Sequence, residues 1–108
     1  MPTPRPGRPV RGSRSGRPLM AALDLLGRRH ALRVLFELRE GALRFRELAA
    51  RCGDVSPSVL NARLRELRES GLIAQETASG YRLTERGAEL GTVLAPLARW
   101  SEAWARKR

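Results

Sequence analysis

The chain has 108 residues, about one domain's length, and carries 21 Lys and Arg residues against 11 Asp and Glu residues, for a net charge of +10. One Cys and one His exclude an internal disulfide and argue against a zinc site built by this chain. No apolar run could span a membrane and none follows the charged N-terminus, so we expect a cytoplasmic protein without a secretory signal. The positive charge points to a polyanion, most commonly nucleic acid.

The first 18 residues differ in composition from the rest of the chain. They contain five arginines and no acidic residue, and are otherwise rich in Pro, Gly and Ser. Such a segment buries too little apolar surface to offset the entropy of ordering. We therefore expect residues 1–18 to form a disordered Arg-rich arm and residues 19–108 to form the folded domain. The arm either contacts phosphates or a minor groove, or is a solubilising tail.

Two helices are predicted at the start of the domain. The first covers residues 19–26, because Pro18 suits a first helical position and Gly27 suits an exit. The second covers residues 28–40 and ends at Gly41. Its expected buried stripe consists of apolar residues near helical spacing, namely Leu32, Val34, Leu35, Phe36 and Leu38.

Two further helices are joined by a short turn. The first covers residues 45–51, with Phe45 and Leu48 in the core, and the sequence Cys52-Gly53-Asp54 interrupts it. We expect Cys52 to be a small buried apolar residue; a redox switch is the alternative.

The second helix of this pair has the clearest start in the chain. Ser56 can cap it and Pro57 needs no N–H there, and the pattern continues to about Ser70 before Gly71. At 100° per residue its buried face is Leu60, Leu64 and Leu67. The side chains expected to point outward are Ser58, Ala62, Arg65 and Glu69, with Asn61 on one flank.

A change of period follows Gly71. Residues 72–77 are strand-like, residues 78–80 form a turn, and residues 81–83 form a return strand with Arg82 outward. Thr84 can cap a long last helix. That helix carries an apolar stripe of Leu90, Val93, Leu94, Leu97, Trp100 and Trp104.

This order predicts a mainly α fold with a small two-stranded β-hairpin, that is, a winged helix-turn-helix plus a long C-terminal helix. The helix after Ser56 would enter a major groove, where small side chains permit close approach and Arg65 reaches a phosphate or a guanine edge. Arginines at the start of the preceding helix would contact phosphates, and the hairpin would act as the wing. The predicted DNA-binding residues are Arg44, Arg46, Ser56, Ser58, Asn61, Ala62, Arg65 and Arg82.

The last helix predicts a second copy of the chain as a partner. A chain of 108 residues offers little for a long apolar C-terminal helix to pack against, so we expect its stripe to form a homodimer seam rather than an internal core. The predicted dimer-interface residues are Leu19, Leu23, Leu94, Leu97, Trp100 and Trp104.

Between about Leu19 and Trp104 the sequence resembles HxlR-type bacterial transcriptional regulators. The resemblance lies in the segments 22–27 (ALDLLG) and 83–87 (LTERG) and, most specifically, in the run RFRELAARCGDVSPSVLNARLRELRESGLI. It implies a homodimer that binds a pseudo-palindromic operator, with the first and last helices building the interface. The chain departs from the family in lacking a Cys before the first helix, in having Arg28-Arg29-His30 after Gly27, and in its short wing, which puts thiol sensing and wing contacts in doubt.

The sequence also bears on three other classes of function. A catalytic role lacks its parts, since no nucleophile–base set, carboxylate pair or phosphate loop is present, and no cofactor is expected. A winged-helix module that binds protein is the main alternative to specific DNA binding. A ligand-gated regulator, with a pocket lined by Leu94, Leu97 and Trp100, stays open, although no polar constellation identifies an effector.

Overall fold

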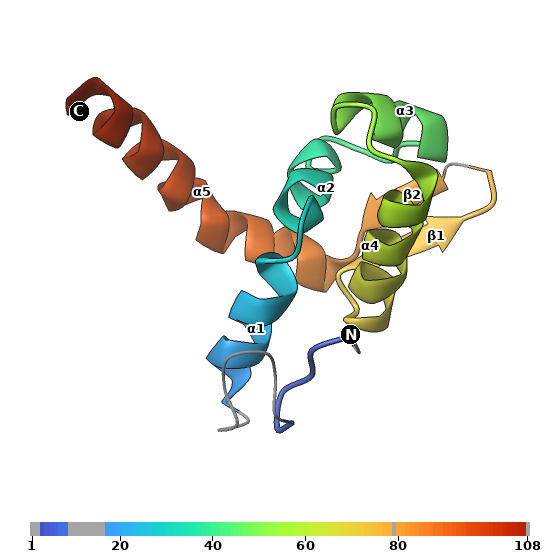
Figure 1. Ribbon diagram of the computed structural model, residues 1–108, viewed down its shortest axis with the longest axis horizontal. Coiled ribbons are helices and arrows are strands. Elements are labelled where there is room, and N and C mark those ends of the chain that lie inside the picture. Colours follow the sequence, from blue (N-terminus) through green and yellow to red (C-terminus); the bar gives the residue numbers. More distant parts are fainter. Residues whose placement is uncertain (1–2, 9–16, 79, 108) are drawn as a thin grey trace.

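The computed structural model describes residues 3–8, 17–78 and 80–107. That part contains five helices and a two-stranded antiparallel hairpin; the hairpin lies at one side, next to α3 and α4, and α5 extends away on the other side (Figure 1). The predicted winged helix-turn-helix with a long last helix is confirmed. None of the helices described is long and apolar enough to cross a membrane. The elements are α1 (Pro18–Leu26), α2 (Ala31–Glu37), α3 (Phe45–Arg51), α4 (Pro57–Glu69), β1 (Ile73–Glu76), β2 (Gly80–Leu83) and α5 (Glu85–Lys107).

The helix α4 begins and ends as its sequence predicts. The Ser56 hydroxyl accepts a hydrogen bond from the Val59 N–H at 3.4 Å, and Pro57 occupies the first turn. Gly71, with a φ of 78°, follows the C-terminal end in the left-handed region that favours glycine. The apolar face is fully covered, because Leu60, Leu64 and Leu67 are at most 1% exposed.

The helix α2 differs from the prediction in its start and in its buried face. It begins at Ala31, because residues 28–30 form a turn in which His30 has a φ of 69°. The assignment of Leu32 and Phe36 to the buried stripe is wrong, since they are 39% and 51% exposed. Apolar residues surround this helix, so their spacing alone does not select a face. The neighbours α1, α3 and α5 instead cover the side that carries Ala31, Val34, Leu35 and Leu38.

The hairpin is joined to the residues that precede α3. Leu43 and Tyr81 exchange two backbone hydrogen bonds, of 2.9 Å and 2.8 Å, in an antiparallel bridge. Gly80, with a φ of 89°, permits this approach, because a Cβ at that position would lie 2.4 Å from the Leu43 carbonyl oxygen. The hairpin and the start of α3 are therefore held together.

The first turn of α5 is fixed against the end of α4 and the start of β1. The Thr84 hydroxyl accepts from the Gly87 N–H at 3.1 Å and donates to the Gly71 carbonyl at 2.6 Å, so the predicted cap is confirmed. A Cβ at position 87 would lie 2.1 Å from the Leu72 carbonyl oxygen, so Gly87 allows the helix to pack there. Leu90 still packs against the core, and the later part of α5 extends away from the domain (Figure 1).

The core lies between the helices and the hairpin. Leu48 is fully buried, Phe45 packs against the core in part, and Cys52 is 6% exposed, as expected for a small buried apolar residue. Of the arm, Arg11 and Arg14 lie outside the described residues. The division into an arm of residues 1–18 and a domain of residues 19–108 stays a prediction.

Candidate nucleic-acid interface

The outward face of α4 is small and polar near its N-terminal end. Ser58, Asn61 and Arg65 are exposed and Ala62 is half-buried. These short side chains leave room for a base-pair edge close to the helix backbone. Within the described residues, the Arg65 guanidinium has no hydrogen bond or ion pair, so it is available to an external acceptor.

The start of α4 is held by Ser56 and is open to solvent. Ser56 Oγ caps the helix and lies 3.5 Å from Ser58 Oγ. The remaining N–H groups of the first turn and the positive end of the helix dipole favour a negatively charged neighbour. This end of α4 thus combines hydroxyl donors with a positive potential.

The two arginines at the start of α3 have different surroundings. Arg46 is exposed and makes no hydrogen bond or ion pair with a described residue. The Arg44 guanidinium donates to the Ala78 carbonyl of the hairpin turn at 3.2 Å, and the Arg44 N–H donates to Glu47 Oε1 at 3.1 Å. Arg46 is therefore free to reach a phosphate, whereas Arg44 also holds the hairpin.

The wing arginine is paired within the hairpin. Arg82 on β2 forms an ion pair with Glu76 on β1, and both side chains are 46% exposed. An exposed pair of this kind contributes little to stability, because solvent screens it. A phosphate could therefore take the place of Glu76 at small cost. The role of Arg82 in DNA binding stays a prediction.

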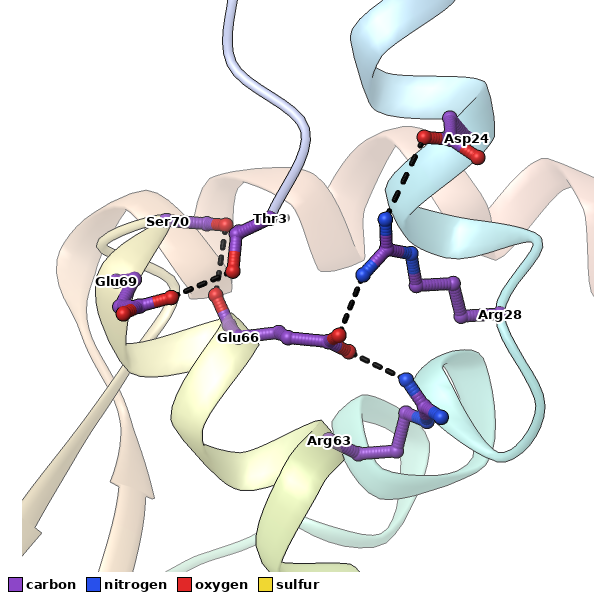
Figure 2. Close-up of polar contacts among 7 residues, drawn as sticks. All are labelled: Thr3, Asp24, Arg28, Arg63, Glu66, Glu69 and Ser70. Carbon is purple, nitrogen blue, oxygen red and sulfur yellow. Dashed lines mark hydrogen bonds and ion pairs between the residues drawn. The ribbon is translucent and has the colours of Figure 1, made fainter. Parts of the chain in front are cut away.

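Thr3, the first described residue of the arm, contacts the opposite end of α4. Thr3 donates to the Glu69 carboxylate at the C-terminal end of α4, Pro4 is buried, and the segment then runs away from α4 (Figures 1 and 2). A helix of 13 residues is about 20 Å long. This contact is therefore about one helix length away from Ser56, whereas Glu69 follows Arg65 by one turn on the outward face of α4.

Exposed apolar side chains lie along α1 and along α5. Leu19 and Leu23 on α1 are 66% and 55% exposed, and Leu94 on α5 is half-buried. The other exposed apolar residues of α5 are Val93, Leu97, Trp100 and Trp104, at 52–69%. The two tryptophan rings stack with centroids 5.5 Å apart and planes 13° apart. An apolar area of this kind is typical of a surface that another protein covers.

A groove of about 550 Å³ lies between α1, the C-terminal end of α4 and the first turns of α5. Its lining includes Leu25, Leu90 and Val93, with Pro4 of the arm at one side. This groove does not include Leu94, Leu97 or Trp100, so an effector pocket lined by those residues stays a prediction.

Cys52 does not have the surroundings of a reactive thiol. Burial raises the pKa of this thiol; the nearby Arg33 lowers it and Glu37 raises it again. A raised pKa leaves less thiolate at neutral pH, and thiolate is the reactive form. The structure therefore favours a packing role.

Sequence reasoning missed a buried cluster of charges. Glu66 of α4 is 4% exposed, and its carboxylate accepts from Arg63 on the same helix at 2.5 Å and from Arg28 in the turn after α1 (Figure 2). Arg28 also pairs with Asp24 of α1 at 3.6 Å. The i,i+3 spacing of Arg63 and Glu66 beside the buried leucines was a local signal. The long-range partner Arg28 had no such signal.

Comparisons with known proteins agree on one class. Residues 25–108 match the family model described as HxlR-like helix-turn-helix. The uncharacterized HTH-type transcriptional regulator YvaP of Bacillus subtilis is 30% identical over 89 residues, which cover 77% of this chain and 82% of that one. The uncharacterized HTH-type transcriptional regulator Rv3095 of Mycobacterium tuberculosis is 37% identical over 89 residues, and the chain spans 56% of its length, with 77% of this chain covered.

A solved structure shares the fold. The crystal structure of a possible HxlR family transcriptional factor from Thermoplasma volcanium aligns with a TM-score of 0.73 at 26% identity. The alignment covers 82% of this chain and 85% of that chain. The elements that carry Arg65 and the exposed tryptophans thus lie within a fold that transcriptional regulators use.

Proposed function

Because the chain belongs to the HxlR-like helix-turn-helix family, whose matched relatives are transcriptional regulators, we propose that it is a homodimer that recognises a specific double-stranded DNA operator. The exposed face of α4 carries this proposal. Ser58, Asn61 and Arg65 are exposed on a helix that is otherwise packed into the core, and the Arg65 guanidinium is uncommitted among the described residues.

The proposed contacts divide into base recognition and phosphate contacts. Arg65, Asn61 and the small residues Ser58 and Ala62 meet base edges in the major groove. The phosphate contacts come from Arg44 and Arg46 on α3, the Ser56 end of α4, and Arg82 on the wing.

The exposed apolar faces of α1 and α5 support the homodimer. They are contributed by Leu19 and Leu23 on one helix and by Leu94, Leu97, Trp100 and Trp104 on the other. In a two-fold symmetric dimer each copy offers the same surface to the other, so these faces would cover one another. Two α4 helices would then reach two half-sites about one turn of DNA apart.

Selection of bound fragments from genomic DNA by the purified protein tests the proposal. We expect an enriched motif with two-fold symmetry and half-sites about 10 base pairs apart or a multiple of that. Binding to all duplexes without an enriched motif would contradict sequence specificity. Absence of binding to random duplex at low salt would favour the protein-interaction module instead.

Salt dependence tests the electrostatic part. With six phosphate contacts per dimer, the logarithm of the binding constant should fall with the logarithm of salt concentration with a slope of about −5. A slope near zero would contradict the phosphate contacts assigned to the arginines.

A further inference from the structure

We propose that the buried charges Arg28 and Glu66 set the angle between α1 and α4, and thereby select the spacing between the operator half-sites. This inference rests on the proposed function. The two side chains are at most 10% exposed, and neither residue belongs to the proposed DNA-facing surface or the proposed dimer surface.

The cluster connects the relevant helices directly. The Arg28 guanidinium lies between the Asp24 carboxylate of α1 and the Glu66 carboxylate of α4 (Figure 2). Arg63 holds the second oxygen of Glu66 at 2.5 Å. The exposed fractions of the Arg28, Asp24 and Glu66 side chains are 10%, 8% and 5%, so water has little access to the pairs.

The backbone around Arg28 is also fixed. Gly27 ends α1 with its N–H on the Leu23 carbonyl at 2.9 Å, and the Ala31 N–H returns to the Arg28 carbonyl at 3.0 Å. A Cβ at Gly27 would lie 2.9 Å from the Leu23 carbonyl oxygen, so the turn is tight. Arg28 therefore leaves α1 in a defined direction.

Stability alone does not explain this cluster. Two carboxylates and two guanidinium groups cancel in charge, but burying such pairs often stabilises a fold no more than apolar residues would. In addition, Arg63 Nε is buried without a hydrogen-bond partner among the described residues, which has a cost. Charge-assisted hydrogen bonds do, however, impose direction, whereas leucine contacts tolerate sliding. The cluster is thus better suited to fixing an orientation.

The orientation matters because the proposed dimer has two α4 helices. In such a dimer each α4 lies about 17 Å from the two-fold axis, half of the roughly 34 Å between half-site centres. Ser56 lies 10 residues before Glu66, which is about 15 Å along α4. A tilt of α4 by about 10° about the cluster would move its Ser56 end by about 3 Å, close to the spacing of about 3.4 Å between base pairs. A loosened cluster would therefore let the dimer accept a spacing one base pair longer or shorter.

The test uses the full chain and synthetic duplexes. Two copies of the half-site recovered by genomic selection are placed at spacings that vary by single base pairs. The variant Glu66→Gln removes the buried carboxylate, and Glu69→Gln is the matched control, since it makes the same charge change at an exposed position three residues further along α4. Arg28→Met is the second variant, because it keeps the Arg63–Glu66 pair and the aliphatic stem.

We expect the wild-type protein and Glu69→Gln to prefer one spacing by about tenfold over its one-base-pair neighbours, an effect comparable to one mismatched base pair. For Glu66→Gln and Arg28→Met we expect this preference to fall below about threefold while the base preference within each half-site is kept. Circular dichroism and sedimentation establish that each variant is folded and dimeric; if Glu66→Gln is not, Arg28→Met decides.

Two results would overturn the inference. An unchanged spacing preference in a folded variant, or an equal loss of affinity at all spacings, would show that the cluster only contributes stability. If the wild-type protein itself shows no preferred spacing, the proposed dimeric operator fails, and this inference with it. The wild-type result therefore separates the two failures.

Discussion

The helices α4 and α5 are both amphipathic, yet they present opposite faces to solvent. α4 buries Leu60, Leu64 and Leu67 in this chain and exposes Ser58 and Arg65. α5 extends from the domain with Val93, Leu97, Trp100 and Trp104 exposed (Figure 1). An exposed polar face is stable in contact with water, so its exposure alone does not indicate a binding partner. Its charge and shape have to indicate one. An exposed apolar face is typical of a surface that a second protein molecule covers.

The largest expected effect concerns the apolar face. The substitution Trp100→Glu places a charge in the proposed seam, and loss of a tryptophan anchor typically costs about 2–4 kcal/mol, or about 30-fold to 1,000-fold in the dimer dissociation constant. Sedimentation velocity measures the change. Ala95→Glu is the control, because it adds the same charge on the opposite side of α5. Equal dimer dissociation constants for the two variants would contradict the assignment of the apolar face of α5 to the dimer interface.

The next effect concerns the polar face. Replacing Arg65 by Ala should weaken operator binding by about 1–3 kcal/mol and relax the base preference at one position, without changing dimerisation. Arg99→Ala, which removes an exposed arginine from α5, should leave the base preference unchanged. Fluorescence anisotropy with the operator and with single-base variants measures both. An unchanged affinity and motif for Arg65→Ala would contradict base recognition by this residue.

A smaller effect compares the caps of the two helices. Ser56→Ala and Thr84→Ala each remove a hydroxyl that accepts an N–H in the first turn, so each should lower the free energy of unfolding by about 1 kcal/mol. Only Ser56 lies at the proposed DNA face, so only Ser56→Ala should also weaken operator binding in excess of the change in folded protein. Denaturant titration and anisotropy give the two quantities. Equal DNA affinities for the two variants would show that Ser56 caps α4 without contributing to DNA binding.

The smallest expected effect is none. Because burial raises the pKa of Cys52, a thiol reagent at neutral pH should alter neither dimerisation nor operator binding, and Cys52→Ala should behave in the same way. Mass spectrometry should find the thiol unmodified until the protein is unfolded. Loss of operator binding in the wild-type protein but not in Cys52→Ala would assign Cys52 a sensing role.

Local signals account for most of the fold. The caps and glycines that bound α4, and the change of period after Gly71, act within a few residues, so the sequence was sufficient to predict α4 and the hairpin. The face of α2 was not predictable in this way. Its apolar residues surround the helix, and the arrangement of α1, α3 and α5 decides that Val34 is covered while Phe36 is exposed.

The candidate site was predictable to a different degree. Which residues of α4 point outward follows from helical spacing, and the structure agrees for Ser58 and Arg65. The ion pair of Arg82 with Glu76 requires the register of the hairpin, and the bond from Arg28 to Glu66 joins positions 38 residues apart. Such pairs depend on tertiary geometry, which no short-range pattern specifies.

Packing at Gly87 determines the direction in which α5 extends from the domain. The missing side chain at this position lets the base of α5 rest on the Leu72 carbonyl, where a methyl group would lie only 2.1 Å from the oxygen. Trp104 lies 17 residues further on, which is about 25 Å along the axis. A tilt of about 10° forced at the base would therefore move the tryptophan by about 4 Å. The direction of α5, and with it the position of its exposed tryptophans, thus depends on the absence of a Cβ atom at Gly87.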